Sequence, residues 1–305
     1  MSVTMAQAII HGPTDITINL QYDSGTGLYK ATGTAPAKSS YNQTDHYYNV
    51  TLRAEDDAGN VTEIDATDSA LGQALRLFVK EKVAPVITIT SPTSGALITN
   101  NKPAITFKVT DDDSGVDPNT IGITIDNGAK ITSGITKTPV SGGYECSYTP
   151  ATALSDGQHT IKIDASDHDG NAAAQKSVTF KVDTVAPTLN LTSPADNLVT
   201  NLASCVVSGT TNDATSSPVT VTVKLNSGAA EEVTVGENGA FSTTLTLTQG
   251  ANTITVVATD AAGKSTTIVR HVTLDTGAPV FSDPVITPNP VDAGNTFVIS
   301  VTITD

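Results

Sequence analysis

Two phrases recur along this chain with one shared period, and they constrain its fold more than any other feature of the sequence. The first consists of an acidic residue, two variable residues and Ala-Pro, followed by an alternating apolar stretch. The second is an Asp-x-x-Gly turn. The first phrase occurs at residues 81–85, 183–187 and 275–279, and the second at residues 56–59, 167–170 and 260–263. A shared spacing of roughly 90 to 110 residues is typical of a tandem array of similar domains.

The composition favours β-strands and excludes two classes of partner. Thr, Ser, Val and Ile are abundant, Trp is absent, and aromatic residues make up only 4% of the chain. Lys and Arg number 16 against 31 Asp and Glu, which gives a net charge of −15. We therefore expect no binding to nucleic acid, whose phosphates require positive charge, or to anionic membrane surfaces. No stretch of the sequence reaches the ~18 apolar residues of a membrane span, so we expect no membrane insertion.

Residues 83–183 show the alternation of short strands separated by turn residues. The strands predicted in this repeat cover residues 86–89, 104–109, 121–125, 143–148, 159–163 and 177–182. Residues 184–275 repeat the pattern strand for strand. About seven short strands in about 100 residues are typical of an immunoglobulin-type sandwich. We therefore predict an all-β protein built of tandem Ig-like β-sandwich domains.

The Asp-Thr-x-Ala-Pro linker and the Asp-x-x-Gly-Asn turn resemble those of the bacterial Ig-like domains found in surface adhesins and phage tail proteins. The resemblance covers residues 83–275 well and residues 1–82 more weakly. It implies an Ig-like domain at 1–82, complete domains at 83–183 and 184–275, and a partial domain at 276–305. Proline fixes φ and favours an extended predecessor, so we expect the linkers to hold the domains in an elongated rod.

The two ends of the chain show complementary deficits. Residues 1–82 lack counterparts of the first two strands of the repeat, whereas residues 276–305 contain counterparts of those two strands only. Three interpretations are open. The sequence is a fragment cut within a repeat, or the first domain closes with its own strands at 3–10 and 14–22. Alternatively, the C-terminal strands complete the first domain of another copy, because added strands saturate an exposed sheet edge.

The sequence contains no recognisable catalytic motif. The histidines are scattered over different predicted strands and loops, and no nucleophile elbow, phosphate loop or zinc motif is present. We therefore expect no enzymatic activity. Cys146 and Cys205 lie in different repeats and alternate in phase with apolar neighbours, so we expect both to be buried free thiols. A gap-free alignment places Cys205 at the position of Ile105.

Acidic residues are expected to converge at the head of the second domain, because two loops of an Ig-type sandwich lie at the end where the linker enters. The candidate calcium ligands are Glu81 from the linker, Asp111, Asp112, Asp113 and Asp117 from the first loop, and Asp167, Asp169 and Asn171 from the second. Calcium takes six to eight oxygen ligands. Similar adhesins and cadherin-like proteins bind calcium at such junctions. The alternative is that these residues serve turn geometry, with Asp and Asn bonding backbone.

The corresponding end of the third domain offers fewer acidic residues, namely Asp183, Asp213 and Asp260, and Lys264 replaces the Asn of its turn. We expect calcium to favour the second domain over the third. Apart from calcium, we expect no cofactor.

The resemblance implies a non-enzymatic structural and adhesive role. The first residues lack the basic head and long apolar stretch of a secretory signal, which favours a phage or prophage tail-associated virion component made in the bacterial cytoplasm. The alternatives are a secreted bacterial cell-surface adhesin and an accessory module of a carbohydrate-active enzyme. The expected partners are other virion or surface subunits, a second copy of the chain bound head to tail, and a cell-surface glycan.

Overall fold

A computed structural model describes residues 2–305, and its regular structure is almost entirely β-strand. Most strand pairs are antiparallel, and the repeats form pairs of facing sheets, so the predicted all-β, Ig-like fold class is confirmed. The chain divides into two compact units, Met1–Val182 and Asp183–Asp305, and each is described by itself. No helix within the described residues is long and apolar enough to cross a membrane.

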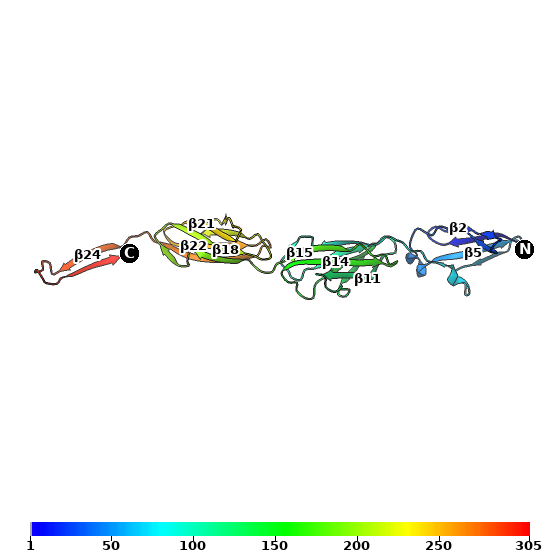
Figure 1. Cartoon of the computed structure of the whole chain (residues 1–305), viewed down its shortest axis with the longest axis horizontal. Helices are drawn as coiled ribbons and strands as arrows, with labels where there is room; N and C mark the ends of the chain where they lie inside the picture. The colour runs from blue at the N-terminus through cyan, green and yellow to red at the C-terminus, as the bar shows by residue number, and fades with distance from the viewer. Residues whose placement is uncertain (1) are drawn as a thin grey trace. The chain divides into compact units, whose positions relative to one another are not determined.

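The second domain is a two-sheet sandwich. One sheet has the order β12-β13-β10-β8, and the other has the order β11-β14-β15-β9. Figure 1 shows β11, β14 and β15 side by side. The strands are β8 (Val86–Ser91), β9 (Leu97–Ile98), β10 (Ile105–Thr110), β11 (Val116–Ile125), β12 (Thr136–Val140), β13 (Gly143–Tyr148), β14 (Gly157–Asp167) and β15 (Lys176–Val182).

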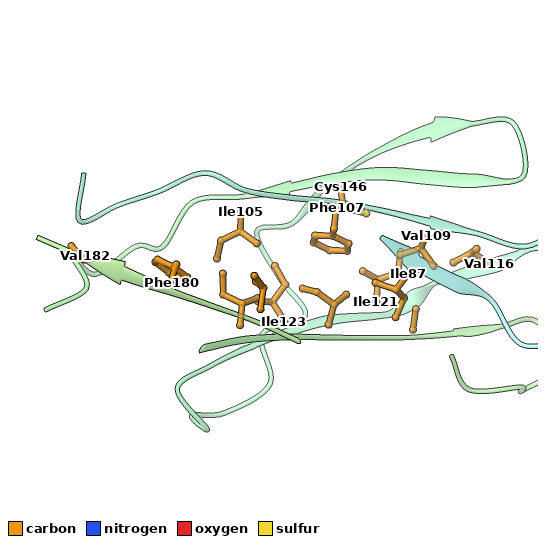
Figure 2. Packing of buried hydrophobic residues seen from close by; sticks show 14 residues of the cluster. Ile87, Ile105, Phe107, Val109, Val116, Ile121, Ile123, Cys146, Phe180 and Val182 are labelled. Atoms are coloured by element: carbon orange, nitrogen blue, oxygen red, sulfur yellow. The ribbon is translucent and has the colours of Figure 1, made fainter. Parts of the chain in front are cut away.

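The core of the second domain follows from the alternation of its strands, because successive side chains of a strand point to opposite faces. Along β10, Ile105, Phe107 and Val109 are at most 2% exposed, and the residues between them are more accessible. Figure 2 shows Phe107 beside Cys146, with which it pairs across β10 and β13. The prediction for this cysteine is confirmed, since Cys146 is buried and free. Burial raises the pKa of the Cys146 thiol to about 11.

The third domain repeats this sandwich. Its sheets have the orders β16-β18-β21 and β17-β23-β22-β19-β20. The strands are β16 (Thr188–Ser193), β17 (Leu198–Thr200), β18 (Ser204–Asn212), β19 (Thr220–Leu225), β20 (Glu231–Val233), β21 (Ala240–Thr246), β22 (Gly250–Thr259) and β23 (Ser265–Leu274). Cys205 is a buried free thiol, as predicted. The gap-free alignment of Cys205 with Ile105 is wrong by two residues, however. The register of β16 with β18, compared with that of β8 with β10, places Val207 at the position of Ile105.

The first domain contains one larger sheet and a separate hairpin. The sheet has the order β2-β1-β5-β6, β7 also pairs with β5, and the hairpin consists of β3 and β4. The strands are β1 (Val3–Ile10), β2 (Ile16–Asn19), β3 (Gln21–Asp23), β4 (Leu28–Lys30), β5 (Tyr48–Asp56), β6 (Val61–Ile64) and β7 (Arg76–Leu77), with 3-10 helices η1 (Ser40–Asn42), η2 (Thr44–His46) and η3 (Gly72–Leu75). Strand β1 pairs with β5 as β11 pairs with β14.

The last strands of the chain form an antiparallel hairpin of β24 (Val280–Thr287) and β25 (Val298–Thr304). Figure 1 shows this hairpin at the C-terminus. Nearly all of its residues are exposed, including its apolar ones.

A buried histidine should make the stability of the second domain depend on pH. His159 is 5% exposed, its Nδ1 lies 2.6 Å from Oδ2 of Asp126, and its Nε2 lies 2.7 Å from the carbonyl oxygen of Ser155. Burial by itself lowers the pKa of His159, but the hydrogen bonds to Asp126 and Ser155 outweigh burial and raise the pKa above 6.5. The protonated ring donates to both acceptors.

Because His159 binds its proton more tightly in the folded state, protonation stabilises the folded domain. This stabilisation is complete below the unfolded-state pKa and is lost as the pH rises through the folded-state pKa. We therefore expect the second-domain melting temperature to fall as the pH rises from below 6.5 to well above it. Calorimetric melts across this range should show the decrease, and Asp126→Asn should reduce it. An equal pH dependence in the two proteins would contradict the assignment to His159.

Candidate calcium sites at the domain heads

Three acidic side chains meet at the head of the second domain. Asp111 directly follows β10, Asp167 is the last residue of β14, and Glu81 lies in the linker that enters the domain. One carboxylate oxygen of each lies within 4.8 Å of the others. Asp111 and Asp167 are only 6% and 2% exposed. The predicted convergence of linker and loops at this end of the sandwich thus brings together three of the eight predicted ligands.

Hydrogen bonds from the loops hold these carboxylates in place. Oδ1 of Asp111 accepts from the backbone N–H groups of Asp113 and Gly115, at 3.0 and 2.8 Å. Asn171 donates to both oxygens of Asp167, through its backbone N–H at 2.8 Å and its Nδ2 at 2.7 Å. The turn interpretation of these residues therefore holds, and the same turns aim the carboxylates at one point.

Other predicted ligands are engaged elsewhere. Oδ1 of Asp117 accepts from the N–H of Asn119 at 2.9 Å, and Asp112 is exposed. Asp113 accepts the N–H of Ser39 from the first domain at 3.1 Å. Asp169 accepts the N–H of Glu81 at 2.9 Å. The last two contacts fasten the first domain and the linker to the second domain.

The third domain carries the same arrangement. Asp183 lies in its linker, Asp213 follows β18 and Asp260 follows β22, and one oxygen of each lies within 4.8 Å of the others. Asp183 is fully buried and Asp260 is 5% exposed. Oδ1 of Asp183 accepts from the N–H of Val185, and Oδ1 of Asp260 accepts from the N–H of Lys264.

The two clusters differ in how completely the protein satisfies their oxygens. Oδ2 of Asp183 and Oδ2 of Asp260 are buried and have no hydrogen-bond partner. In the second domain the Asn171 side chain donates to the corresponding oxygen of Asp167, whereas Lys264 takes this position in the third domain. The replacement of Asn by Lys264, on which the expectation of weaker calcium binding in the third domain partly rested, therefore leaves Oδ2 of Asp260 without a partner.

The negative charge of the two carboxylate clusters makes a cation a suitable occupant of each. None of the ion pairs among residues 2–305 includes any of the six clustered carboxylates. A buried carboxylate without a partner is costly, and like charges in close proximity add to that cost. The two unpartnered oxygens and the all-carboxylate ligand set fit a hard cation, which prefers oxygen ligands.

Family comparisons match two consecutive stretches of the chain. Residues 89–184 match the family described as bacterial Ig-like domain, and residues 187–276 match domain B of glucodextranase. Bacillopeptidase F of Bacillus subtilis is 30% identical over 215 residues, which correspond to 70% of this chain. The chain spans 14% of the length of that protein.

Comparison with solved structures finds similarity to immunoglobulin and fibronectin(III)-like domains at low sequence identity. Immunoglobulin domains 1–5 of Sidekick-1 are 11% identical, with a TM-score of 0.41 over 99% of this chain and 60% of that chain. The fibronectin(III)-like modules of CbhA from Clostridium thermocellum are 18% identical, with a TM-score of 0.34 over 62% of this chain and 94% of that chain. The match of residues 89–184 to the bacterial Ig-like family and the repeated sandwiches described above identify the chain as an Ig-like repeat protein.

Proposed function

We propose that this chain is a non-catalytic spacer segment of a larger bacterial protein, and that calcium bound at the domain heads fixes the linker between consecutive domains. The comparisons support an accessory role, because the match to bacillopeptidase F corresponds to a small part of that protein and the match to glucodextranase corresponds to one of its domains. A carbohydrate-active or surface protein is a suitable setting for such a segment.

The observation that carries this proposal is the way the second domain holds its linker. The Glu81 side chain accepts the N–H of Ser114 at 2.6 Å, while its backbone N–H donates to Asp169 at 2.9 Å. The carbonyl oxygen of Glu81 accepts from Nδ2 of Asn171 at 3.2 Å. Both loops of the domain head therefore bind one linker residue, and a cation between Glu81, Asp111 and Asp167 would add a further bond to the same residue.

The chemistry of the two clusters favours calcium over other metals. Their ligand atoms are carboxylate oxygens, without the His or Cys that transition metals prefer. Calcium tolerates irregular ligand geometry and completes its shell with waters and carbonyl oxygens, whereas magnesium demands a near-ideal octahedron. In each cluster the linker supplies one carboxylate and the loops supply two. Bound calcium therefore connects the linker to the domain that follows it.

The proposed spacer role is compatible with both locations predicted from the sequence, the virion and the cell surface. Mass spectrometry of purified phage-like particles and of the cell-surface fraction from the producing strain distinguishes them. Recovery of the protein in the particles supports the virion setting, and recovery in the surface fraction alone supports an adhesin or an accessory module.

Calcium should narrow the range of distances between the first and second domains. Spin labels at the exposed residues Ser24 and Ser133 report this distance in the full chain. We expect a narrow distribution in millimolar calcium and a broad one in chelator, because the metal fixes the linker at Glu81.

The variant Glu81→Gln should show the broad distribution in both buffers. Glu145→Gln is the matched control, because it removes the same charge at an exposed position of β13, and it should behave as the unmodified chain does. Equal widths in calcium and in chelator for the unmodified chain would contradict the proposed spacer function.

A further inference from the structure

An aromatic pair lies on the outward face of the larger sheet of the first domain. Tyr48 of β5 is 1% exposed and pairs with Leu77 of β7. Tyr47 and Phe78 are one step further along this register, so they lie on the opposite face of the sheet. Their rings are in edge contact, with centroids 6.2 Å apart, and Phe78 is 65% exposed. The pair therefore adds little to the core of the domain.

The other two domains carry smaller or polar residues at the same positions. Strand β5 corresponds to β14 and β22, because each leads into the Asp of its Asp-x-x-Gly turn. The counterparts of Tyr47 and Phe78 are Gln158 and Lys181 in the second domain, and Ala251 and Thr273 in the third. All four are exposed. Because those sandwiches form without aromatic rings at this point, the fold does not require the pair.

An arginine stands beside the two rings. Arg76 pairs with Asn49 on the same face, and its guanidinium carbon lies 4.9 Å from the centre of the Tyr47 ring. Its Nε is buried without a hydrogen-bond partner, and no ion pair among residues 2–305 includes it. A guanidinium carries five N–H donors, and its contact with an aromatic face is favourable. The aromatic group of Tyr47, Phe78 and Arg76 thus combines an exposed ring with fixed donors.

A polar hollow lies further along the same face. Its volume is about 330 Å³, and it is lined by Thr51, Glu63, Ile64, Asp65, Thr67 and Asp68. Asn49 connects this hollow with the aromatic group. It pairs with Arg76, it precedes Thr51 by two positions in β5, and its Oδ1 accepts from the N–H of Ala66 at 2.9 Å.

Two carboxylates of the hollow are held as ionised acceptors. Oδ1 of Asp65 accepts from the hydroxyl of Thr67 at 2.6 Å and from its N–H at 2.8 Å, and these bonds lower the pKa of Asp65. Oδ1 of Asp68 accepts from the N–H groups of Leu71 and Ala70 at 2.8 and 2.9 Å, and these bonds lower the pKa of Asp68. Both carboxylates therefore stay charged at neutral pH and can accept from hydroxyl groups.

We propose that this face of the first domain binds a neutral oligosaccharide, with one sugar ring stacked on Phe78 and the hydroxyls of the next in the hollow. The C–H groups on the face of a pyranose suit the negative face of an aromatic ring. Sugar hydroxyls both donate and accept, so they match the carboxylates of Asp65 and Asp68 and the guanidinium of Arg76. From residue 47 to residue 51 the strand spans about 13 Å, which is longer than one sugar ring.

The chemistry of the face disfavours other classes of ligand. Its carboxylates repel uronates and phosphates. The cores of protein–protein contacts are depleted of Asp and Glu, which are abundant here. The volume of the hollow falls within the range of roughly 300 to 1,000 Å³ that small-ligand pockets occupy. The face contains none of the six clustered carboxylates, so this inference goes beyond the calcium-dependent spacer function and is tested separately from it.

An array of oligosaccharides tests the ligand class with the 305-residue chain. It carries neutral hexose and N-acetylhexosamine oligomers together with uronate-containing ones. We expect binding to members of the neutral set and none to the uronates. Binding to no neutral oligosaccharide, or to uronates alone, would overturn the proposal.

Substitutions of Phe78 test the surface, with the affinity for the best neutral oligosaccharide measured by titration calorimetry. Phe78→Ala should weaken binding by about 10-fold or more, as for other central aromatic contacts. Phe281→Ala is the matched control, because it removes the same side chain at 67% exposure from β24. It should bind as the unmodified chain does. Equal affinities of Phe78→Ala and Phe281→Ala would show that the sugar binds elsewhere and would overturn the proposal.

A second pair of variants separates ring stacking from simple apolar contact. Phe78→Tyr keeps the ring and should retain the affinity of the unmodified chain. Phe78→Leu keeps an apolar side chain without a ring and should bind as weakly as Phe78→Ala. Full affinity of the Leu variant is incompatible with the stacked sugar and would overturn the assignment.

Discussion

Removal of calcium should lower the melting temperature of the third domain by roughly 10 to 20 °C. A ligand that binds only the folded state at 100 times its dissociation constant stabilises that state by about 2.7 kcal/mol. One kcal/mol corresponds to roughly 4 to 8 °C for a domain of this size. The physical basis is the burial of Asp183 and Asp260, each with one unpartnered oxygen, beside Asp213. Calorimetry of the full chain in millimolar calcium and in chelator measures the difference.

The variant Asp260→Asn separates calcium binding from other causes of such a shift. Asn keeps the oxygen that accepts from the N–H of Lys264 and removes one of three neighbouring negative charges. We therefore expect the variant to melt higher than the unmodified chain in chelator and to lose its response to calcium. Glu232→Gln removes an exposed charge of the same domain and should leave the response intact. The calcium site is refuted if the unmodified chain melts identically in the two buffers.

The alternation of apolar and polar residues predicted most of the strands, because the apolar residues of this pattern are the ones that pack in the core. Residues 104–109 were predicted as a strand, and β10 covers Ile105–Thr110. The prediction was less accurate at 121–125, since β11 begins at Val116. Its early start comes from the pairing of Val116 with Asp167. This pairing places Asp117 within a strand, opposite Ser166, and so outside the cluster that the loop assignment predicted.

The number of acidic residues in a loop does not predict which carboxylate oxygens remain without a hydrogen-bond partner. The sequence placed more acidic groups near the second domain head, but several of them are fixed by other contacts. The unpartnered oxygens lie in the third domain, because Asn171 donates to Asp167 and Lys264 provides no comparable bond to Asp260. The exchange of Asn for Lys was visible in the sequence. Its consequence depends on which carboxylate oxygen the missing side chain would have reached, and only the folded geometry specifies that.

Truncation of a core aromatic should destabilise the second domain more than any surface change. Phe107 is 2% exposed and lies between its strand neighbours Ile89 and Cys146. Phe107→Ala removes most of a buried ring and leaves a cavity, and such changes cost about 3 to 5 kcal/mol. The neighbouring Lys108→Ala, on the outward face of β10, should change stability by less than about 0.5 kcal/mol.

Amide hydrogen exchange measures the opening of each domain separately within the full chain. Exchange from β14 should accelerate by about 100-fold or more in Phe107→Ala, since each 1.4 kcal/mol is a factor of ten in the opening equilibrium. Exchange from β22 of the third domain serves as the internal control and should stay unchanged. Equal protection of β14 in Phe107→Ala and Lys108→Ala would contradict the packing of Phe107 as the centre of this core.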